Sequence, residues 1–575
     1  MSRKLIDNAR RRLAAETGCR AKPWGGRLSV ALVYPNTYHQ AMSNLGFLSI
    51  YQLLNSREDT LCERFFLPDA EDMAEHRKTG YPLFSLESGR LLADFDVIAF
   101  SISFENDYLN LPHLFDLANI PLWSRERDDR FPLVISGGVC AFLNPEPLAD
   151  IIDLFVVGEG EAILPALVES IGSTGQLGRP EMLRQLASVP GVYVPSQYQI
   201  DYRADGTLAG WSHPADVPER VRRQWVHDLD ATQSRSFVLT EQTEFSDMAL
   251  TEISRGCSRG CRFCAAGFIY LPPRERSLDS LLGQIEAGLC EREKVGLVGA
   301  AVSDYSQIAS LNQAILERGG KISVASLRID SLTAKEVEAL KISGHRTVAL
   351  APEAGSQRMR DAINKGLDRR QILDAVSLLA EGGIPNLKLY FLVGLPGEQA
   401  ADIDEMLDLA GEIRELWMAA GKKRGRLGNL TLSVNPFIPK PFTPFQWAAM
   451  VDEKSLKRTF QAIRSAVARM PNTEVIFESP RSAVLQAFLA RGDRRVGQTL
   501  PLLAAGDNLK SACRKSGLDP AFYVTRQRGE SERFPWEILD SGVRREALWR
   551  EYLSGLDARL SPRCFDGCTR CGVCD

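Results

Sequence analysis

The sequence predicts an α/β protein of several domains, with parallel sheets in its N-terminal and central parts and helices toward its C-terminus. Two observations favour this class: short apolar runs alternate with helix-length stretches, and glycine turns follow several of those runs. With 575 residues and 44% hydrophobic content the chain is long enough for roughly three or four cores. The net charge of −4 provides no basic field for nucleic acid. No stretch approaches the ~18 apolar residues of a membrane span, and the start lacks a signal core, so we expect a cytoplasmic protein without a membrane partner.

A polar lead-in, residues 1–24, precedes the first expected domain, residues 25–171. Its predicted strands lie at 28–34, 97–101, 133–136 and 154–157, and their spacing is typical of a small doubly wound, Rossmann-like domain. Two of these strands end in the turns Ser136-Gly137-Gly138 and Gly158-Glu159-Gly160. In open α/β sheets ligands bind at that edge, where a backbone without Cβ allows close approach.

A connector, residues 172–245, leads to a second region of alternating pattern at 246–450. Predicted strands near 248–254, 295–302, 321–328, 346–351, 386–393 and 429–437 are separated by helical stretches. Six such units predict a partial (β/α)6 barrel of the TIM type. Residues 451–575 are expected to be mostly helical and to end in a cysteine-rich motif.

Seven of the twelve cysteines fall in two groups, and the other five are interpreted as inert thiols. The first group, Cys257, Cys261 and Cys264, has the spacing C-x3-C-x2-C and follows the first barrel strand. Thiolates bind iron–sulfur clusters, and three ligands leave one of four irons open. A zinc knuckle or a chance grouping is the structural alternative.

This spacing and position, with Phe263 before the last cysteine, resemble the radical S-adenosylmethionine (SAM) superfamily over about residues 250–450. The resemblance implies a [4Fe–4S] cluster whose open iron chelates SAM. Reductive cleavage then gives a 5′-deoxyadenosyl radical that abstracts hydrogen. It also implies a reductant partner such as flavodoxin or ferredoxin.

The same resemblance implies further SAM contacts, although a purely structural role is the alternative for each residue. The family's Gly-Gly-Glu turn is replaced by a run from Gly299 that includes Ser303, so the amino-group contact departs from the pattern. Ser326 and Arg328 would share one face of the third strand and hold the SAM carboxylate and ribose. The other expected contacts are Glu353, Lys388 and Tyr390.

A doubly wound domain before such a barrel resembles the cobalamin-binding subgroup of this superfamily. The phrases Val33-Tyr34-Pro35-Asn36-Thr37-Tyr38 and Met42-Ser43-Asn44-Leu45-Gly46 carry the likeness. The Asp-x-His-x-x-Gly motif of classical cobalamin proteins is missing, so cobalamin would bind without a histidine ligand. The resemblance places Ser136, Gly137, Gly138, Gly158 and Gly160 near the corrin tail. A domain used for substrate docking or packing is the alternative.

The second cysteine group stands at the end of the sequence. Its spacing is C-x3-C-x2-C-x2-C, and its members are Cys564, Cys568, Cys571 and Cys574. Four thiols within eleven residues can close around one metal centre. A second [4Fe–4S] cluster is the first interpretation and a structural zinc the second. A disulfide pair is the least favoured interpretation in a reducing compartment.

The leading hypothesis is a radical SAM enzyme that carries out cobalamin-assisted methyl transfer to an unactivated centre. Sulfur insertion without cobalamin, as in the methylthiotransferases, is a second enzyme hypothesis. An iron–sulfur redox sensor or assembly partner is the non-enzymatic one. The substrate, whether a protein, an RNA or a small molecule, stays open because no basic aromatic stripe indicates RNA.

Overall fold

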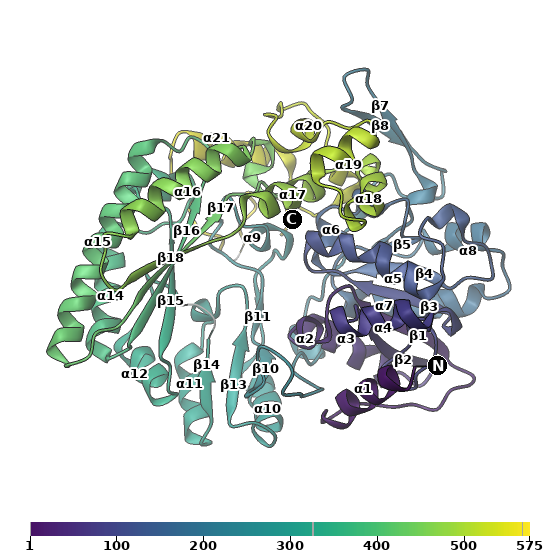
Figure 1. The fold of residues 1–575 in the computed structure, drawn as a ribbon, viewed down its shortest axis with the longest axis horizontal. Coiled ribbons are helices and arrows are strands. Elements are labelled where there is room, and N and C mark those ends of the chain that lie inside the picture. Colours follow the sequence, from purple (N-terminus) through teal and green to yellow (C-terminus); the bar gives the residue numbers. More distant parts are fainter. Residues whose placement is uncertain (1, 325–326, 566, 575) are drawn as a thin grey trace. The chain divides into compact units, whose positions relative to one another are not determined.

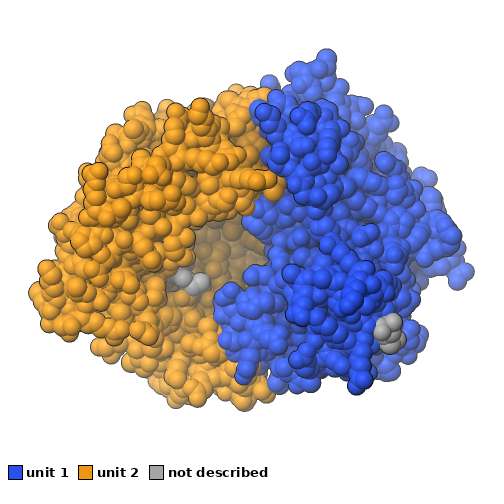
Figure 2. Space-filling view, viewed as in Figure 1, with its two compact units in different colours: residues 1–246, 488–523, 531–542 blue, residues 247–487, 524–530, 543–575 orange. Residues whose placement is uncertain are grey.

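The computed structural model describes residues 2–324, 327–565 and 567–574. The chain forms two compact units, coloured separately in Figure 2. Unit 1 contains residues 1–246, 488–523 and 531–542, and unit 2 contains residues 247–487, 524–530 and 543–575. The region 451–575, predicted as one helical stretch, is thus divided between the two units.

Unit 1 is built on a six-stranded sheet of order β2-β1-β3-β4-β5-β6 (Figure 1). Neighbours from β2 to β5 are parallel, and β6 runs antiparallel to β5. The strand order reverses direction between β1 and β3, the switch point at which doubly wound sheets bind ligands. The strands are β1 (Leu28–Tyr34), β2 (Thr60–Phe66), β3 (Val97–Ser101), β4 (Leu133–Gly137), β5 (Leu154–Val156) and β6 (Val192–Tyr193).

The four runs predicted as strands are confirmed as β1, β3, β4 and β5, whereas β2 was not predicted. Its sequence carries the charged pair Glu63 and Arg64 in the middle of an edge strand. The Arg64 guanidinium is completely buried because Glu16 and Glu87 pair with it at 2.6 and 2.7 Å. Charged side chains can be buried when they are paired, so the sequence of β2 looks polar although the strand lies in the core.

The connector contributes only small elements to unit 1. It contains α8, the strand β6 that pairs with β5 in the main sheet, the hairpin of β7 and β8, and β9, which pairs in parallel with β19. The remaining elements of the unit are α1 (Arg3–Ala14), α2 (Tyr38–Met42), α3 (Leu45–Ser56), α4 (Ala70–Thr79), α5 (Leu111–Ala118), α6 (Val139–Leu143), α7 (Gly160–Thr174), α8 (Arg179–Leu186), β7 (Gln199–Tyr202), β8 (Leu208–Ser212), β9 (Val221–Arg222), α18 (Leu500–Ala504), α19 (Leu509–Lys515) and β19 (Leu539–Asp540).

Unit 2 contains seven strands that pair in parallel, in sheets of order β10-β13-β14 and β15-β16-β17-β18. A parallel bridge between Leu327 and Leu350 links the segment after β14 to β15. The last strand, β18, was not predicted; its Glu474 and Ile476 are exposed, as an edge strand allows. The strands are β10 (Met248–Glu252), β13 (Lys294–Val298), β14 (Lys321–Ser323), β15 (Thr347–Glu353), β16 (Asn386–Val393), β17 (Leu430–Pro436) and β18 (Thr473–Phe477).

The two faces of these strands differ in burial. In β16 the residues Leu387, Leu389 and Phe391 are buried, whereas the alternating Lys388 and Tyr390 are half-buried. Figure 1 shows α12, α14 and α15 on the outer side of the strands. Helices that cover a sheet bury its apolar face, which in β16 is the buried set. The half-buried set therefore lines the inner face of the sheet.

Helices α10 to α16 connect successive parallel strands of unit 2, as crossover connections require, and α21 follows the last of these strands. They are α10 (Leu278–Leu289), α11 (Ile308–Glu317), α12 (Ala334–Ile342), α13 (Gln357–Ala362), α14 (Arg369–Gly382), α15 (Ala400–Lys423), α16 (Glu453–Val467) and α21 (Arg545–Leu556), with α9 (Ala266–Ile269) and the short strands β11 (Ser254–Arg255) and β12 (Arg274–Glu275) near the first cysteine group. Two further helices, α17 (Pro480–Arg491) and α20 (Pro520–Val524), cross from one unit's residues to the other's. Within the described residues, none of the helices combines the length and the apolar character of a membrane span.

Candidate functional site

The first cysteine group lies on the loop between β11 and α9, directly beyond the carboxyl end of β10. This loop, residues 256–265, is called the cluster loop below. Cys261 is buried, and Cys257, Cys264 and Phe263 are half-buried. In barrels built of parallel strands, side chains at the carboxyl ends of the strands form the catalytic face. The cysteines thus directly follow the first strands of unit 2, as the sequence predicts.

Arg259, in the middle of the cluster loop, fixes the loop to two neighbouring strand ends. Its guanidinium pairs with Asp304, after β13, and with Asp330, after β14. Burial would raise the pKa of Asp330, but the charges and hydrogen bonds of Arg328 and Arg259 outweigh it and lower that pKa to about 2. Both carboxylates thus pair with arginines of neighbouring segments, and Asp330 stays deprotonated at neutral pH.

Arg328 has one hydrogen-bonding arm in use and one that is not. Its Nε donates to Asp330 Oδ1 at 3.2 Å. Its Nη2 is buried and has no hydrogen-bond partner among the residues that the structure describes. A buried cationic donor without a partner is costly, so this arm fits an anionic oxygen from outside the chain, such as the predicted SAM carboxylate. Ser326, predicted to act beside it, lies outside the described residues.

Glu353 ends β15 with an unusual backbone. Its φ is +66°, and the register of β15 on β16 shifts between Leu350 and Glu353. A left-handed conformation in a residue with a Cβ stores strain, and such residues cluster at functional sites. The Glu353 carboxylate pairs with Lys365 Nζ at 3.4 Å. The sequence-predicted acid thus lies at the same strand edge as Arg328 and the cluster loop.

Lys365 is a residue that the sequence analysis missed. Its side chain is only 9% exposed, and it follows α13 in the run Asn364-Lys365-Gly366. Burial raises the pKa of the Cys261 thiol, and the positive charge of Lys365 opposes that rise. The available signal was a lysine after a helix end, which in sequence resembles an ordinary solvated turn.

Cys264, the last cysteine of the cluster loop, has a raised pKa as well. Burial raises the pKa of Cys264 to about 12, and the neighbouring charge of Cys261 adds to the effect. Metal binding therefore has to displace a proton from this thiol. In the described part of the chain, no three Cys, His, Asp or Glu side chains form a ready-made metal site.

Lys388 and Tyr390 share the inner face of β16, as predicted, with Lys388 Nζ 4.9 Å from the Tyr390 ring centre. They line a cavity of about 210 Å³ together with residues that begin β15, among them His345 and Thr347. Lys388 precedes the carboxyl end of β16 by five residues, about 17 Å at the rise of a strand. Lys388 thus lies near the beginning of β16, in a cavity that Leu327, directly before Arg328, also lines.

Ser303, the remaining predicted SAM contact, lies in the 3-10 turn Val302–Asp304. Gly299, which opens that segment, is close to β11: a Cβ on it would lie 2.8 Å from Ser254 Oγ. The turn is thus packed against the strand that leads into the cluster loop. This contact accounts for the glycine, and the half-buried Ser303 stays a predicted ligand.

The glycine turns of unit 1 are accounted for by the protein's own packing. A Cβ on Gly138 would lie 2.5 Å from the Ile102 carbonyl oxygen, and a Cβ on Gly160 would lie 2.5 Å from Ile50 Cδ1. A Cβ on Gly158 would overlap the carbonyl oxygen of Gln224, with which Gly158 forms a parallel bridge. The connector thus covers the turn after β5, and these residues do not form an open cradle for a corrin ring.

At the end of β4, Ser136 is enclosed, whereas the position of Gly137 has room for a Cβ. Ser136 is buried, and its Oγ has no hydrogen-bond partner among the described residues. Gly137 has only Val156 Cβ, at 3.8 Å, near the position of a Cβ.

Asp107, which the sequence analysis did not name, accepts a hydrogen bond from Asn36 Nδ2 at 2.8 Å. Burial raises the pKa of Asp107 to about 6, although that hydrogen bond opposes the rise.

The second cysteine group lies in unit 2, on the segment that follows α21. Cys568 is buried, Cys564 and Cys571 are half-buried, and Cys574 is exposed. Burial raises the pKa of Cys564 to about 11, and the charges of the other three thiols each raise it further. The four sulfurs therefore lie close enough to one another to interact.

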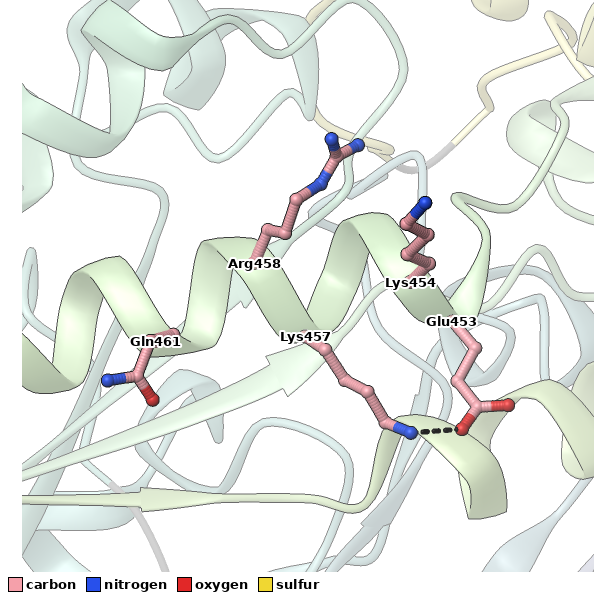
Figure 3. Close-up of a pocket in the computed structure, with 5 residues that line it drawn as sticks. All are labelled: Glu453, Lys454, Lys457, Arg458 and Gln461. Atoms are coloured by element: carbon pink, nitrogen blue, oxygen red, sulfur yellow. Dashed lines mark ion pairs between the residues drawn. The ribbon is translucent and has the colours of Figure 1, made fainter.

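The outer surface of α16 carries a shallow depression (Figure 3). Glu453 and Lys457 pair at 2.6 Å across one helical turn, as the dashed line in Figure 3 marks. Such pairs are ordinary features of exposed helices. All of its lining residues come from one helix, and they are Glu453, Lys454, Lys457, Arg458 and Gln461. The depression therefore offers no chemistry comparable to the cluster loop.

Comparison with known proteins gives relatives along most of the chain. Uncharacterized protein MJ0966 of Methanocaldococcus jannaschii is 30% identical over 497 residues, which cover 85% of this chain and 94% of that protein. Uncharacterized methyltransferase PH0819 of Pyrococcus horikoshii is 24% identical over 49% of this chain and 58% of that protein. A tRNA-2-methylthio-N(6)-dimethylallyladenosine synthase of Prosthecochloris aestuarii is 24% identical over 49% of this chain and 68% of that protein.

Solved structures and family models give further similarities. The structure of the cobalamin-dependent SAM radical enzyme OxsB, with aqua-cobalamin and SAM bound, covers 69% of this chain and 56% of its own, at a TM-score of 0.45 and 17% identity. Residues 46–195 match the model for the N-terminal domain of radical SAM proteins. Residues 251–410 match the radical SAM superfamily model, and this range contains the cluster loop, Arg328 and Glu353. With these two matches and a relative that is 30% identical over 85% of this chain, the chain belongs to the radical SAM superfamily.

Proposed function

We propose that this chain reductively cleaves SAM at a [4Fe–4S] cluster bound by Cys257, Cys261 and Cys264. It then modifies a substrate held over the carboxyl ends of the strands of unit 2. Membership of the radical SAM superfamily implies the cluster and SAM. When bound, they supply a carbon-centred radical that abstracts hydrogen from the substrate.

The observation that carries the proposal is the unpartnered arm of Arg328. Its Nη2 is buried beside the cluster loop without a hydrogen-bond partner among the described residues, while its Nε is held by Asp330. Asp330 is in turn held by Arg259 of the cluster loop. This chain of contacts orients a free cationic donor next to the cysteines. A carboxylate is the ligand group that such a donor binds most strongly.

Glu353 and Lys365 form an ion pair that also acts on the cluster loop. The ion pair between them lies at the carboxyl end of β15, and the charge of Lys365 acts on Cys261. A positive charge beside the cysteines favours thiolates over thiols, and thiolates are the species that bind iron. Glu353, whose backbone is strained at the end of β15, can accept hydrogen bonds from ribose hydroxyl groups.

Methyl transfer is the reaction class that we favour, because one relative, which matches 49% of this chain, is named a methyltransferase. Cobalamin as the methyl carrier stays a prediction of the sequence. Three of the glycines predicted to contact it, at positions 138, 158 and 160, are accounted for by Ile102, Gln224 and Ile50. We therefore derive no step through cobalamin.

Sulfur insertion is the second candidate reaction. The relative from Prosthecochloris aestuarii is named a methylthio-adenosine synthase of tRNA and matches half of this chain. The net charge of −4 offers no attraction to tRNA, which makes this the weaker candidate. A redox sensor without SAM is disfavoured by the buried free donor on Arg328, which such a protein would not need.

Anaerobic reconstitution followed by SAM and dithionite tests the proposal. We expect 5′-deoxyadenosine or S-adenosylhomocysteine as a product, and none from a variant in which Cys257, Cys261 and Cys264 are all alanine. Cys290→Ala is the matched control, because Cys290 is exposed and belongs to neither group. Absence of both products from a chain with a full complement of cluster iron would reject the proposal.

The role of cobalamin can be measured separately. Purified chain is incubated with hydroxocobalamin and passed through a desalting column, and bound cobalt is read from absorbance. Retention of about one cobalamin per chain would support the carrier hypothesis. No retention, together with SAM cleavage, would leave the cobalamin-independent chemistry.

A further inference from the structure

The C-terminal cysteines repeat the spacing of the cluster loop. Both groups begin with C-x3-C-x2-C, from Cys257 in one case and from Cys564 in the other. The residue before the second cysteine is glycine in each, and Gly260 and Gly567 have φ of +69° and +77°. This left-handed conformation is readily adopted by glycine alone. The two loops therefore share the turn that brings the second thiol back toward the first.

The C-terminal group differs in one respect that decides its chemistry. Cys574 supplies a fourth thiol three residues after Cys571, whereas Cys264 of the cluster loop has no such successor. Four thiolates complete the coordination of a [4Fe–4S] cluster and leave no iron open. A centre of this kind exchanges electrons but cannot chelate SAM.

Arg262, which lies between two cysteines of the cluster loop, anchors the C-terminal segment. Its guanidinium is completely buried and pairs with Glu551 of α21 at 3.0 Å. Its Nη2 also donates to the carbonyl oxygen of Arg559 and to Ser561 Oγ, at 2.8 and 2.9 Å. A buried guanidinium is tolerated only when its donors are satisfied. The cluster loop therefore needs the C-terminal segment in place in order to satisfy Arg262.

Asn364 makes a second link between the cluster loop and the segment that leads into the cysteines. Its Nδ2 donates to the carbonyl oxygen of Gly260 at 3.2 Å, and its Oδ1 accepts from the Ser561 amide at 2.9 Å. Asn364 is buried, so both bonds are shielded from water. One side chain thus ties the two loops together.

The two cysteine groups are in direct contact through their backbones. The Cys564 amide donates to the carbonyl oxygen of Ser258 at 2.7 Å, and Ser258 directly follows Cys257. Arg563 donates to Asp330, the carboxylate that also holds Arg259. Covalent geometry then limits the distance between the Cα atoms of Cys257 and Cys564 to about 11 Å.

We propose that Cys564, Cys568, Cys571 and Cys574 bind a second iron–sulfur cluster, which passes electrons to the SAM-binding cluster of the adjoining loop. Each transfer moves one electron: the second cluster is oxidised by one unit and the first is reduced by one. A low-potential one-electron reductant, such as dithionite or a flavodoxin-type protein, restores the second cluster. No bond to carbon and no proton is involved in this step.

Iron content tests the metal half of the proposal without requiring any activity. After anaerobic reconstitution with ⁵⁷Fe and sulfide, we expect about eight irons per chain for the native protein and for Cys290→Ala. Cys568→Ala/Cys571→Ala is expected to retain about four irons, and so is Cys257→Ala/Cys261→Ala/Cys264→Ala.

The variant without the three cluster-loop cysteines is the decisive one, because its C-terminal segment is intact. Iron bound by this variant, with a Mössbauer spectrum of a [4Fe–4S] cluster, supports the proposal. If it binds no iron, or if the native protein carries zinc in place of the second set of irons, the proposal is overturned. This result is decisive even if the C-terminal variant fails to fold.

The electron-transfer half rests on the proposed cleavage of SAM, and its readout is kept separate from it. Rapid freeze-quench paramagnetic resonance follows reduction of the SAM-binding cluster by dithionite, with SAM bound but before products form. We expect reduction to be several-fold slower in Cys568→Ala/Cys571→Ala and in Arg262→Lys, which loosens the C-terminal segment. An unchanged rate in both variants, each holding its SAM-binding cluster, would reject the relay whether or not SAM is cleaved.

Discussion

Replacing Arg328 with lysine keeps a positive charge after β14 but removes the planar fork of the guanidinium. In the native chain, Nε is used by Asp330 at 3.2 Å and Nη2 is left for the ligand. A lysine has a single nitrogen, and Asp330 would compete for it. Asp330 itself stays paired because Arg259 also holds it, so the fold around the cluster loop should persist.

The size of the effect follows from the one bond that is lost. A hydrogen bond between charged groups contributes about 1.5–3 kcal/mol, which corresponds to a roughly 10- to 150-fold higher Kd for SAM. Because the lysine retains its charge, the lower part of this range is the closer expectation. Cluster content should not change, since Arg328 binds no cysteine in the structure.

The assay is a titration of SAM against the paramagnetic resonance spectrum of the reduced cluster, with iron measured in each sample. Arg318→Lys is the matched control, because Arg318 is in the same unit and pairs on the surface with Glu286. A variant Arg328→Lys that holds a full cluster and binds SAM within twofold of the native protein would refute the assignment. The carboxylate contact would then have to come from elsewhere.

Three further predictions concern stability and cluster assembly. Burial raises the pKa of Glu398 from 4.5 to about 7. The free energy of unfolding of unit 2 should therefore fall as pH rises from about 4.5 through 7, by at most about 3 kcal/mol. Glu398→Gln should flatten this pH dependence in thermal melts. Gly158→Ala should destabilise the chain by about 1–3 kcal/mol in urea melts because φ is +127° and Gln224 is in the way, whereas Gly172→Ala within α7, with open space around it, should not destabilise it. Lys365→Met should slow iron incorporation at pH 7 but much less at pH 9, because the charge of Lys365 opposes the raised pKa of Cys261; equal rates at pH 7 would exclude this role.

The sequence predicted the elements whose pattern is local. Strands β1, β3, β4 and β5 were found because their apolar runs are continuous, as buried parallel strands require. The cluster loop was found because three thiols at fixed spacing are readable without a fold. Strand β2 was missed because Arg64 makes its sequence look polar. Only the ion pairs with Glu16 and Glu87, which are distant in sequence, allow Arg64 to be buried.

Tertiary structure alone decided which of the predicted ligands lie together. Arg328 is linked to the cluster loop through Asp330, and Glu353 ends β15. Lys388 lies near the beginning of β16, in a cavity that Leu327, directly before Arg328, also lines. Alternation along a strand shows which face a side chain occupies, but its position along the sheet depends on where the strand ends. The unoccupied arm of Arg328 could not be seen in the sequence either, since it depends on the position of Asp330.

By itself, the sequence determined the two sets of cysteines, their spacing and the parallel α/β class, since all three depend on residues that are close along the chain. The tertiary structure alone placed the C-terminal set against the cluster loop, although the two are separated by some three hundred residues of sequence. Their association depends on Arg262 and Asn364, whose partners are reached only after the chain has folded. Contacts between distant segments are fixed by packing and by the satisfaction of buried polar groups, and neither has a local signature.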